Sequence, residues 1–218
     1  MILTLLAGAF CQPPAITPPQ DPSKPVVIPL GPSLRLDKTN GRVVIDAEVV
    51  LREGPLEMFL CPRRSKEHES VMVADVRSRD VHFALLLAGA TPGKPVQFDP
   101  PRTPRGQRIK VWIEREIEGK TVLLDAREWI RDEQAKHAMT ADFVFVGSQF
   151  IRAPGSERTF YVGDDGYLIC VANFQAAVID VSQRSTAANA EQRLFIPFTD
   201  QIPEKGTKVR LLLEPVVD

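Results

Sequence analysis

LEMFLCPRRSKEHESVMVADVRSRDVHFALLLAG, residues 56–89, decides the fold, because it combines the most apolar helix-like run with two of the three histidines. Residues 56–61 are too few for a helix and precede Pro62, so we predict a buried strand that ends there. The Val-rich run 69–76 predicts a second strand. If the two strands pair as a hairpin, Cys61 and His68 lie near its turn.

A short helix is predicted at Val81–Ala88, with Asp80 as N-cap and Gly89 at its end. The segment is apolar on every side, so we expect the rest of the fold to enclose it. His82 falls in its first turn, where the positive end of the helix dipole disfavours a protonated imidazole. We therefore expect a neutral His82 that is hydrogen-bonded or bound to a ligand.

The remaining chain predicts short strands joined by turns. Asn40-Gly41 indicates a two-residue hairpin turn between strands 34–39 and 42–51, and further hairpin turns are expected at 118–120 and 164–166. Strands are also expected at 142–148, 177–181, 194–197 and 207–214, and segment 126–138 is expected to be pinned by Trp129 and Ile130. The pattern predicts an α+β fold of predominantly antiparallel β structure, a sandwich or a partly open barrel, with one buried short helix.

Length and charge restrict the class of protein. A chain of 218 residues suits one domain with appendages. Lys and Arg number 27 against 28 Asp and Glu, a net charge of -1, which provides no electrostatic footprint for nucleic acid. The cluster Arg63, Arg64 and Lys66 is interpreted as a solvated turn rather than an anion site.

The N-terminal region predicts export. Residues 1–11 resemble the tail of a signal peptide, with Ala7-Gly8-Ala9 as a cleavage-like site but without a positive n-region. Cys11 suggests a lipoprotein, although Phe10 departs from the small residue used at such sites, and an uncleaved cytoplasmic start is a further alternative. Residues 12–32 contain eight of the 19 prolines and predict a semi-rigid spacer. We expect an extracytoplasmic protein, periplasmic or secreted, with membrane attachment through the N-terminus as an alternative and no transmembrane span in the folded domain.

Six runs of residues carry a family resemblance: EGPLEMFLC (53–61), KEHES (66–70), VHFALLLAG (81–89), DFVFVGS (142–148), GYLICVANF (166–174) and IPEKGTKVRLLLEP (202–215). They resemble the YdjY-type domain of bacteria, which is frequent in exported planctomycete proteins. The resemblance implies a single β-rich domain over residues 33–218 and little biochemistry. Some relatives are described as ferredoxin-like, but an iron–sulfur cluster is not expected, because it needs four thiolates and the chain has three cysteines.

One functional hypothesis is a metal site. His68 and His82, with Cys61 or with Glu67 or Glu69 as third ligand, have the donor types that suit zinc or copper. The spacing does not support a zincin helix, because Met72 stands where H-E-x-x-H needs its second histidine. The alternative is that each histidine is only hydrogen-bonded.

Catalytic hypotheses have less support. Cys61 could be a nucleophile with His68 or His82 as base, but a Cys in an apolar strand is typical of an inert buried thiol. A Cys61–Cys170 disulfide is another alternative. There is no G-x-S-x-G motif for serine catalysis, and Asp164-Asp165-Gly166 is interpreted as a turn rather than a calcium site.

The preferred hypothesis is a non-catalytic extracytoplasmic domain that binds an unknown protein or small ligand. The run predicted to contribute ligand-binding residues is Lys66, Glu67, His68, Glu69 and Ser70. No catalytic residue is predicted.

Overall fold

The computed structural model describes residues 25–152, 154–186 and 194–217. The signal-like residues 1–11, with Cys11, and most of the predicted spacer lie outside this part. Within the spacer, β1 (Val27–Pro29) is a strand that pairs with β2 (Leu34–Asp37). None of the helices in the described ranges is long and apolar enough to cross a bilayer.

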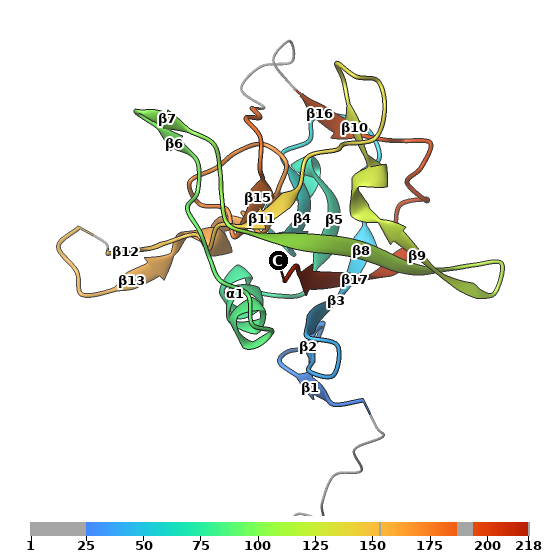
Figure 1. Ribbon diagram of the computed structural model, residues 1–218, viewed down its shortest axis with the longest axis horizontal. Coiled ribbons are helices and arrows are strands. Elements are labelled where there is room, and N and C mark those ends of the chain that lie inside the picture. Colours follow the sequence, from blue (N-terminus) through green and yellow to red (C-terminus); the bar gives the residue numbers. More distant parts are fainter. Residues whose placement is uncertain (1–24, 153, 187–193, 218) are drawn as a thin grey trace, which may run out of the picture.

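Eight strands form a closed β-barrel (Figure 1). Their order around the barrel is β3, β17, β8, β11, β15, β14, β4 and β5, and pairing of β5 with β3 closes it. Their bounds are β3 (Arg42–Val49), β4 (Met58–Pro62), β5 (Ser70–Ala74), β8 (Gln107–Ile117), β11 (Phe143–Phe145), β14 (Ile169–Cys170), β15 (Ile179–Val181) and β17 (Lys208–Pro215). The prediction of a mainly antiparallel β fold is confirmed. The barrel is closed rather than partly open because the β3–β5 pairing leaves no edge between those strands.

Where the long strands line the barrel, every second side chain points into it and contributes to the hydrophobic core. Val43 and Ile45 of β3 lie opposite Leu213 and Leu211 of β17, and all four side chains are fully buried. Leu211 in turn lies opposite Ile113 of β8. Because alternate side chains of a strand point to one face, these residues fill the same hydrophobic core.

The predicted hairpin of residues 56–61 and 69–76 is wrong, because β4 and β5 pair in parallel. Arg64 has a positive φ of 64°, and the 3-10 helix η1 (Glu67–Glu69) brings the chain back beside the start of β4. There the backbone N–H of Glu57 donates to Glu69 O at 3.0 Å. Cys61 lies opposite Val73 at the far ends of these strands, so Cys61 and His68 do not flank one turn.

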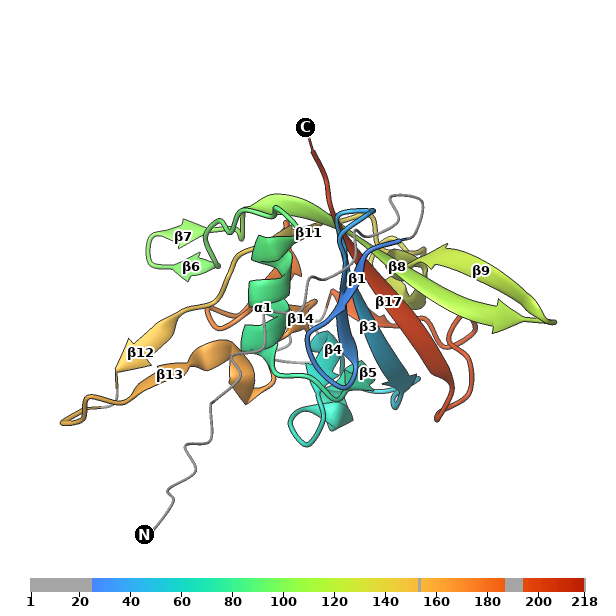
Figure 2. The ribbon, with the colours of Figure 1, turned by 90° about the horizontal axis from the view of Figure 1, so that it is seen from below.

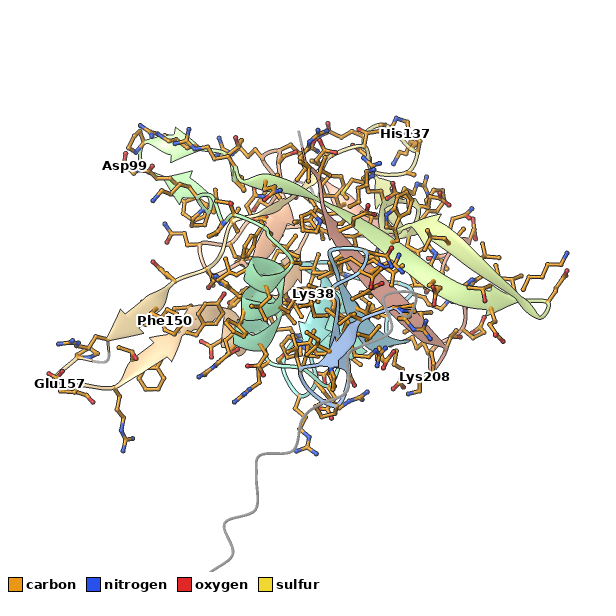
Figure 3. All side chains as sticks on the ribbon, turned by 60° about the horizontal axis from the view of Figure 1, so that its bottom comes forward. Lys38, Asp99, His137, Phe150, Glu157 and Lys208 are labelled. Atoms are coloured by element: carbon orange, nitrogen blue, oxygen red, sulfur yellow. The ribbon has the colours of Figure 1, made fainter. Side chains whose placement is uncertain are left out.

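The remaining strands extend the barrel or form two-stranded ribbons. β9 (Lys120–Asp125) pairs with β8 through a turn at Glu118 and Gly119, which confirms the second predicted hairpin. The ribbons are β6 (Gln97–Phe98) with β7 (Pro101–Arg102), β10 (Ile130–Asp132) with β16 (Phe195–Pro197), and β12 (Phe150–Arg152) with β13 (Thr159–Tyr161). β6–β7 and β12–β13 project from the same side of the barrel (Figures 1 and 2), and Asp99 and Glu157 mark their tips (Figure 3).

Two predicted turns differ from the structure. The first hairpin is confirmed, but its turn spans Lys38–Gly41, because the Asp37 carboxylate accepts from the Asn40 backbone and side chain at 3.1 and 2.7 Å. The predicted third hairpin is wrong: β13 pairs with β12, and residues 164–165 belong to the 3-10 helix η3 (Val162–Asp165). Residues Ala126–Trp129 form a third 3-10 helix, η2, in which Trp129 is buried as predicted.

The helix α1 (Ser78–Leu87) lies against the outside of the barrel (Figure 2). Val81, Ala84 and Leu85 are buried, whereas Phe83, Leu86 and Leu87 are 56%, 42% and 49% exposed. The expectation of an enclosed helix is therefore wrong, because only one face of the helix packs on the barrel. The helix also begins earlier than predicted, with Arg77 as N-cap, and the Asp80 carboxylate accepts from the Arg77 guanidinium instead of capping the helix.

Candidate functional site

Charged side chains meet beside the start of β4. Lys66 Nζ lies 3.5 Å from Glu57 Oε2 and 3.9 Å from Glu69 Oε2, and it also lies 5.0 Å from the centre of the Tyr167 ring. His68 Nε2 is 2.7 Å from Glu69 Oε1, but the His68 side chain is 70% exposed. The run predicted to bind a ligand is therefore divided: Lys66 and Glu69 contact Glu57, whereas His68 extends into solvent.

The other two residues of that run have local structural partners. The Glu67 carboxylate accepts from the backbone N–H of Arg64 and closes the turn after β4. Ser70 is fully buried, and its hydroxyl donates to Met72 O at 2.8 Å. These contacts fix the loop that carries Lys66 and Glu69.

Glu57 and Glu69 form a carboxyl pair that holds one proton near neutral pH. Burial, together with the hydrogen bond and negative charge of Glu69, raises the pKa of Glu57 to about 7 despite the nearby Lys66 ammonium. The hydrogen bond from Glu57 is the main cause that lowers the pKa of Glu69. Glu69 Oε2 is buried and has no other hydrogen-bond partner within the described part of the chain. The protonated Glu57 therefore donates to an ionised Glu69.

Glu57 lines a pocket of about 590 Å³ beneath the β6–β7 ribbon. Apolar contributions come from five side chains: Val96, Phe98, Pro101, Ala172 and Phe174. Asn173 and Ser185 contribute polar groups on the opposite side, and Phe98 is 62% exposed at the rim. A mainly apolar hollow of this size with a few polar groups is the usual form of a small-molecule site.

A buried polar network fixes the wall opposite β6–β7. Asn173 Nδ2 donates to Asp180 Oδ1 at 3.0 Å, and Asn173 Oδ1 accepts from the Ser185 backbone at 2.8 Å. Asp180 also accepts from the backbone N–H of Val181 at 2.8 Å. Burial raises the pKa of Asp180 well above its ordinary value. These hydrogen bonds all join residues within 173–185, so they hold this wall of the pocket in one conformation.

Two arginines stand at the rim of the pocket. Arg102, at the end of β7, and Arg184 are both exposed, and in the described ranges neither side chain makes a hydrogen bond or an ion pair. Among the described residues that line the pocket, Glu57 carries the only carboxyl. While Glu57 is protonated, this described lining carries two positive charges and no negative charge.

Another hollow of similar size is less suited to a ligand. One of about 500 Å³ lies over β3, β17 and β8 and is lined mainly by charged side chains. Its charges already pair with each other, as in Lys208 with Glu48 and Arg210 with Glu114. A ligand there would have to displace existing ion pairs.

His82 lies elsewhere, between α1 and β13. Its Nδ1 is 2.7 Å from the Tyr161 hydroxyl, which donates to Gly147 O at 3.1 Å, and its ring meets that of Phe145 edge-on at 5.0 Å. Burial lowers the pKa of His82, in agreement with the predicted neutral imidazole. The cause is desolvation rather than the helix dipole, because α1 begins at Ser78 and His82 lies beyond its first turn.

The cysteines of the barrel are buried free thiols. Cys61 and Cys170 belong to the same hydrophobic cluster but are not joined by a disulfide. Burial raises the pKa of both thiols. A buried thiol of raised pKa is a poor nucleophile. The imidazole of His68 pairs with Glu69 and that of His82 with Tyr161, so neither histidine is paired with Cys61 as a base.

The three predicted metal ligands Cys61, His68 and His82 are not brought together as one site. Across the described residues no group of three or more His, Cys, Asp or Glu side chains could hold a metal ion. Asp164, from the possible calcium turn, instead accepts hydrogen bonds from the Arg79 backbone and guanidinium.

Reasoning from the sequence missed the main parts of the pocket. Glu57 is a single acid in the apolar run 56–61, and Asn173 and Asp180 are single polar residues in apolar runs. Such isolated polar residues are a usable signal, because burying them requires a partner. The proline-rich loop 91–106 gave no sign that it lines one pocket with Glu57 and residues 172–174.

Fold and site together define a closed-barrel domain with a mainly apolar lateral pocket of about 590 Å³. The model of the YdjY domain family matches residues 34–214, so the chain belongs to the YdjY domain family. Comparisons with curated proteins and with solved structures gave no significant match.

Proposed function

We propose that the protein is a non-catalytic extracytoplasmic binding domain whose ligand occupies the pocket beneath β6–β7. The observation that carries this proposal is the pocket itself, which combines about 590 Å³ of space with apolar side chains and a few polar groups. The rigid wall built on Asn173 and Asp180 supports it further, because a preformed site binds without a large ordering penalty.

The chemistry of the lining favours binding over catalysis. Catalysis by a thiol would need an accessible thiolate, whereas Cys61 and Cys170 are buried. His82, which is half-buried, contacts Tyr161 and Phe145 and is not among the pocket residues. Glu57 has a pKa suited to proton transfer, but its proton is engaged by Glu69.

The extracytoplasmic location rests on the sequence. The apolar residues 1–11 end in a cleavage-like site and are followed by the proline-rich residues 12–32. This order suits a leader and a spacer before a folded domain.

Binding is tested with N-phenyl-1-naphthylamine, an uncharged fluorophore whose emission rises in apolar sites. We expect saturable binding that is removed by Thr103→Trp, which places a bulky ring at the pocket wall. The matched control is Thr121→Trp, an exposed threonine on β9. Binding that is absent, or equally strong in Thr103→Trp, would contradict the proposal.

A further inference from the structure

The charges around the pocket indicate which class of ligand it accepts. The apolar side chains Phe98, Pro101 and Phe174 suit an aromatic or aliphatic body. Arg102 and Arg184 are exposed at the rim, and the described parts of the chain provide no acid or acceptor for either guanidinium. A guanidinium without a protein partner beside an apolar hollow is complementary to a carboxylate or sulfonate.

We propose that the pocket binds a small organic anion, with its apolar body under Phe98 and its acidic group between Arg102 and Arg184. This inference rests on the proposed function and names the ligand class for the same pocket. A ligand of this kind would use all three features of the lining: the apolar wall, the polar network and the two cations.

The carboxyl pair gives this site a dependence on pH. Glu57 faces Glu69 and Lys66, His68 reaches it only through Glu69, and Tyr167 lies under the Lys66 ammonium. The charges of Glu69 and Lys66 offset each other, so the protonation state of Glu57 sets the net charge that the ligand meets. Loss of the Glu57 proton adds a negative charge to the lining and opposes an anion.

Two fluorophores separate the charge from the apolar body. 8-Anilinonaphthalene-1-sulfonate carries a sulfonate that stays ionised at every pH used, and N-phenyl-1-naphthylamine has a similar body without it. Only the fluorescence that Thr103→Trp removes counts as pocket binding, because α1 and β12–β13 also expose apolar side chains.

The arginines are tested by Arg102→Gln and Arg184→Gln. We expect each substitution to weaken sulfonate binding about three- to fivefold, as for an exposed ion pair, and to leave the neutral fluorophore unchanged. Arg158→Gln is the control, since Arg158 lies outside the pocket lining, next to β13. A double variant that carries both Arg102→Gln and Arg184→Gln is measured as well. If it binds the sulfonate as tightly as the wild type does, the inference is overturned.

The pH arm uses the same two fluorophores. Sulfonate affinity should fall about fivefold from pH 5.5 to pH 8.5, and Glu57→Gln should flatten this change. The neutral fluorophore should show no such change in either protein. A sulfonate affinity that is constant with pH in the wild type would contradict the role given to Glu57.

The results distinguish the two proposals. One result would support the proposed binding domain but refute the inference of an anionic ligand. In that result the neutral fluorophore binds in the pocket, and neither arginine substitution changes the affinity for the sulfonate. Failure of both fluorophores to bind in the pocket would remove both proposals together.

Discussion

Replacement of Glu57 by Gln should increase stability above neutral pH. In the folded protein the pKa of Glu57 rises from its ordinary value of 4.5 to about 7. Between these two values the folded chain retains a proton that the unfolded chain has lost, so the free energy of unfolding falls as pH rises. The loss of unfolding free energy caused by ionising Glu57 in the folded protein reaches its full size above about pH 7. A Gln at position 57 never ionises, and its amide can still donate to Glu69.

The size of this effect follows from the change in pKa. An elevation from 4.5 to about 7 corresponds to at most about 3 kcal/mol. The Glu57 side chain is 21% exposed, and solvent screening together with the nearby Lys66 reduces the expected difference to about 1–2 kcal/mol. Well below pH 4.5, Glu57 is protonated in both states, so the variant and wild type should approach the same stability toward the acid end of the range.

The assay is urea denaturation from pH 4.5 to 8.5, followed by the fluorescence of the buried Trp129. The difference in unfolding free energy between Glu57→Gln and wild type should grow with pH and level off near pH 7.5. Glu53→Gln, at an exposed position in the preceding turn, is the control and should run parallel to the wild type. A constant difference between Glu57→Gln and wild type across this range would refute the shared-proton interpretation.

Three further outcomes are expected. Asn173→Ala removes the donor to Asp180 and should lower the unfolding free energy by about 1–3 kcal/mol, measured by urea denaturation; an unchanged midpoint would contradict the buried network. Cys61 and Cys170 are buried and should react with a thiol-directed reagent only after unfolding, so rapid labelling of either of these two thiols in the folded chain, located by peptide mass spectrometry, would be inconsistent with the structure. Elemental analysis should give no stoichiometric zinc or copper; one equivalent that disappears in His68→Ala or His82→Ala would instead support a metal site.

Local pattern predicted much of the fold. The turns at Asn40-Gly41 and at 118–120 predicted two hairpins that the structure contains, because turn residues mark where neighbouring antiparallel strands are joined. Pro62 correctly marked the end of β4. These features depend on neighbours along the chain.

Features that depend on distant partners were not predicted. The parallel pairing of β4 and β5 follows from the path of residues 63–69, which no turn motif announces. The apolar pattern of α1 predicted enclosure, yet Phe83, Leu86 and Leu87 are exposed because the helix packs against the barrel on one side only.

In the candidate site, too, the features that depend on distant partners were not predicted. Lys66 and Glu69 of the polar run predicted to bind a ligand contact Glu57, but they do not line the pocket themselves, and their role stays a prediction. Glu57 and Arg102 on β7 line the pocket and come from segments that are distant in the sequence and meet only in the folded chain. The sequence alone could not show that these segments meet.

The central claim is that the pocket beneath β6–β7 binds a small ligand that has an apolar body. Amide chemical shifts of the 15N-labelled chain, recorded during titration with N-phenyl-1-naphthylamine, test it most directly. We expect saturable changes centred on Thr103, Phe174 and Ser185, which line the pocket. Changes centred instead on the exposed Phe83 and Phe150, or no changes at all, would contradict the claim.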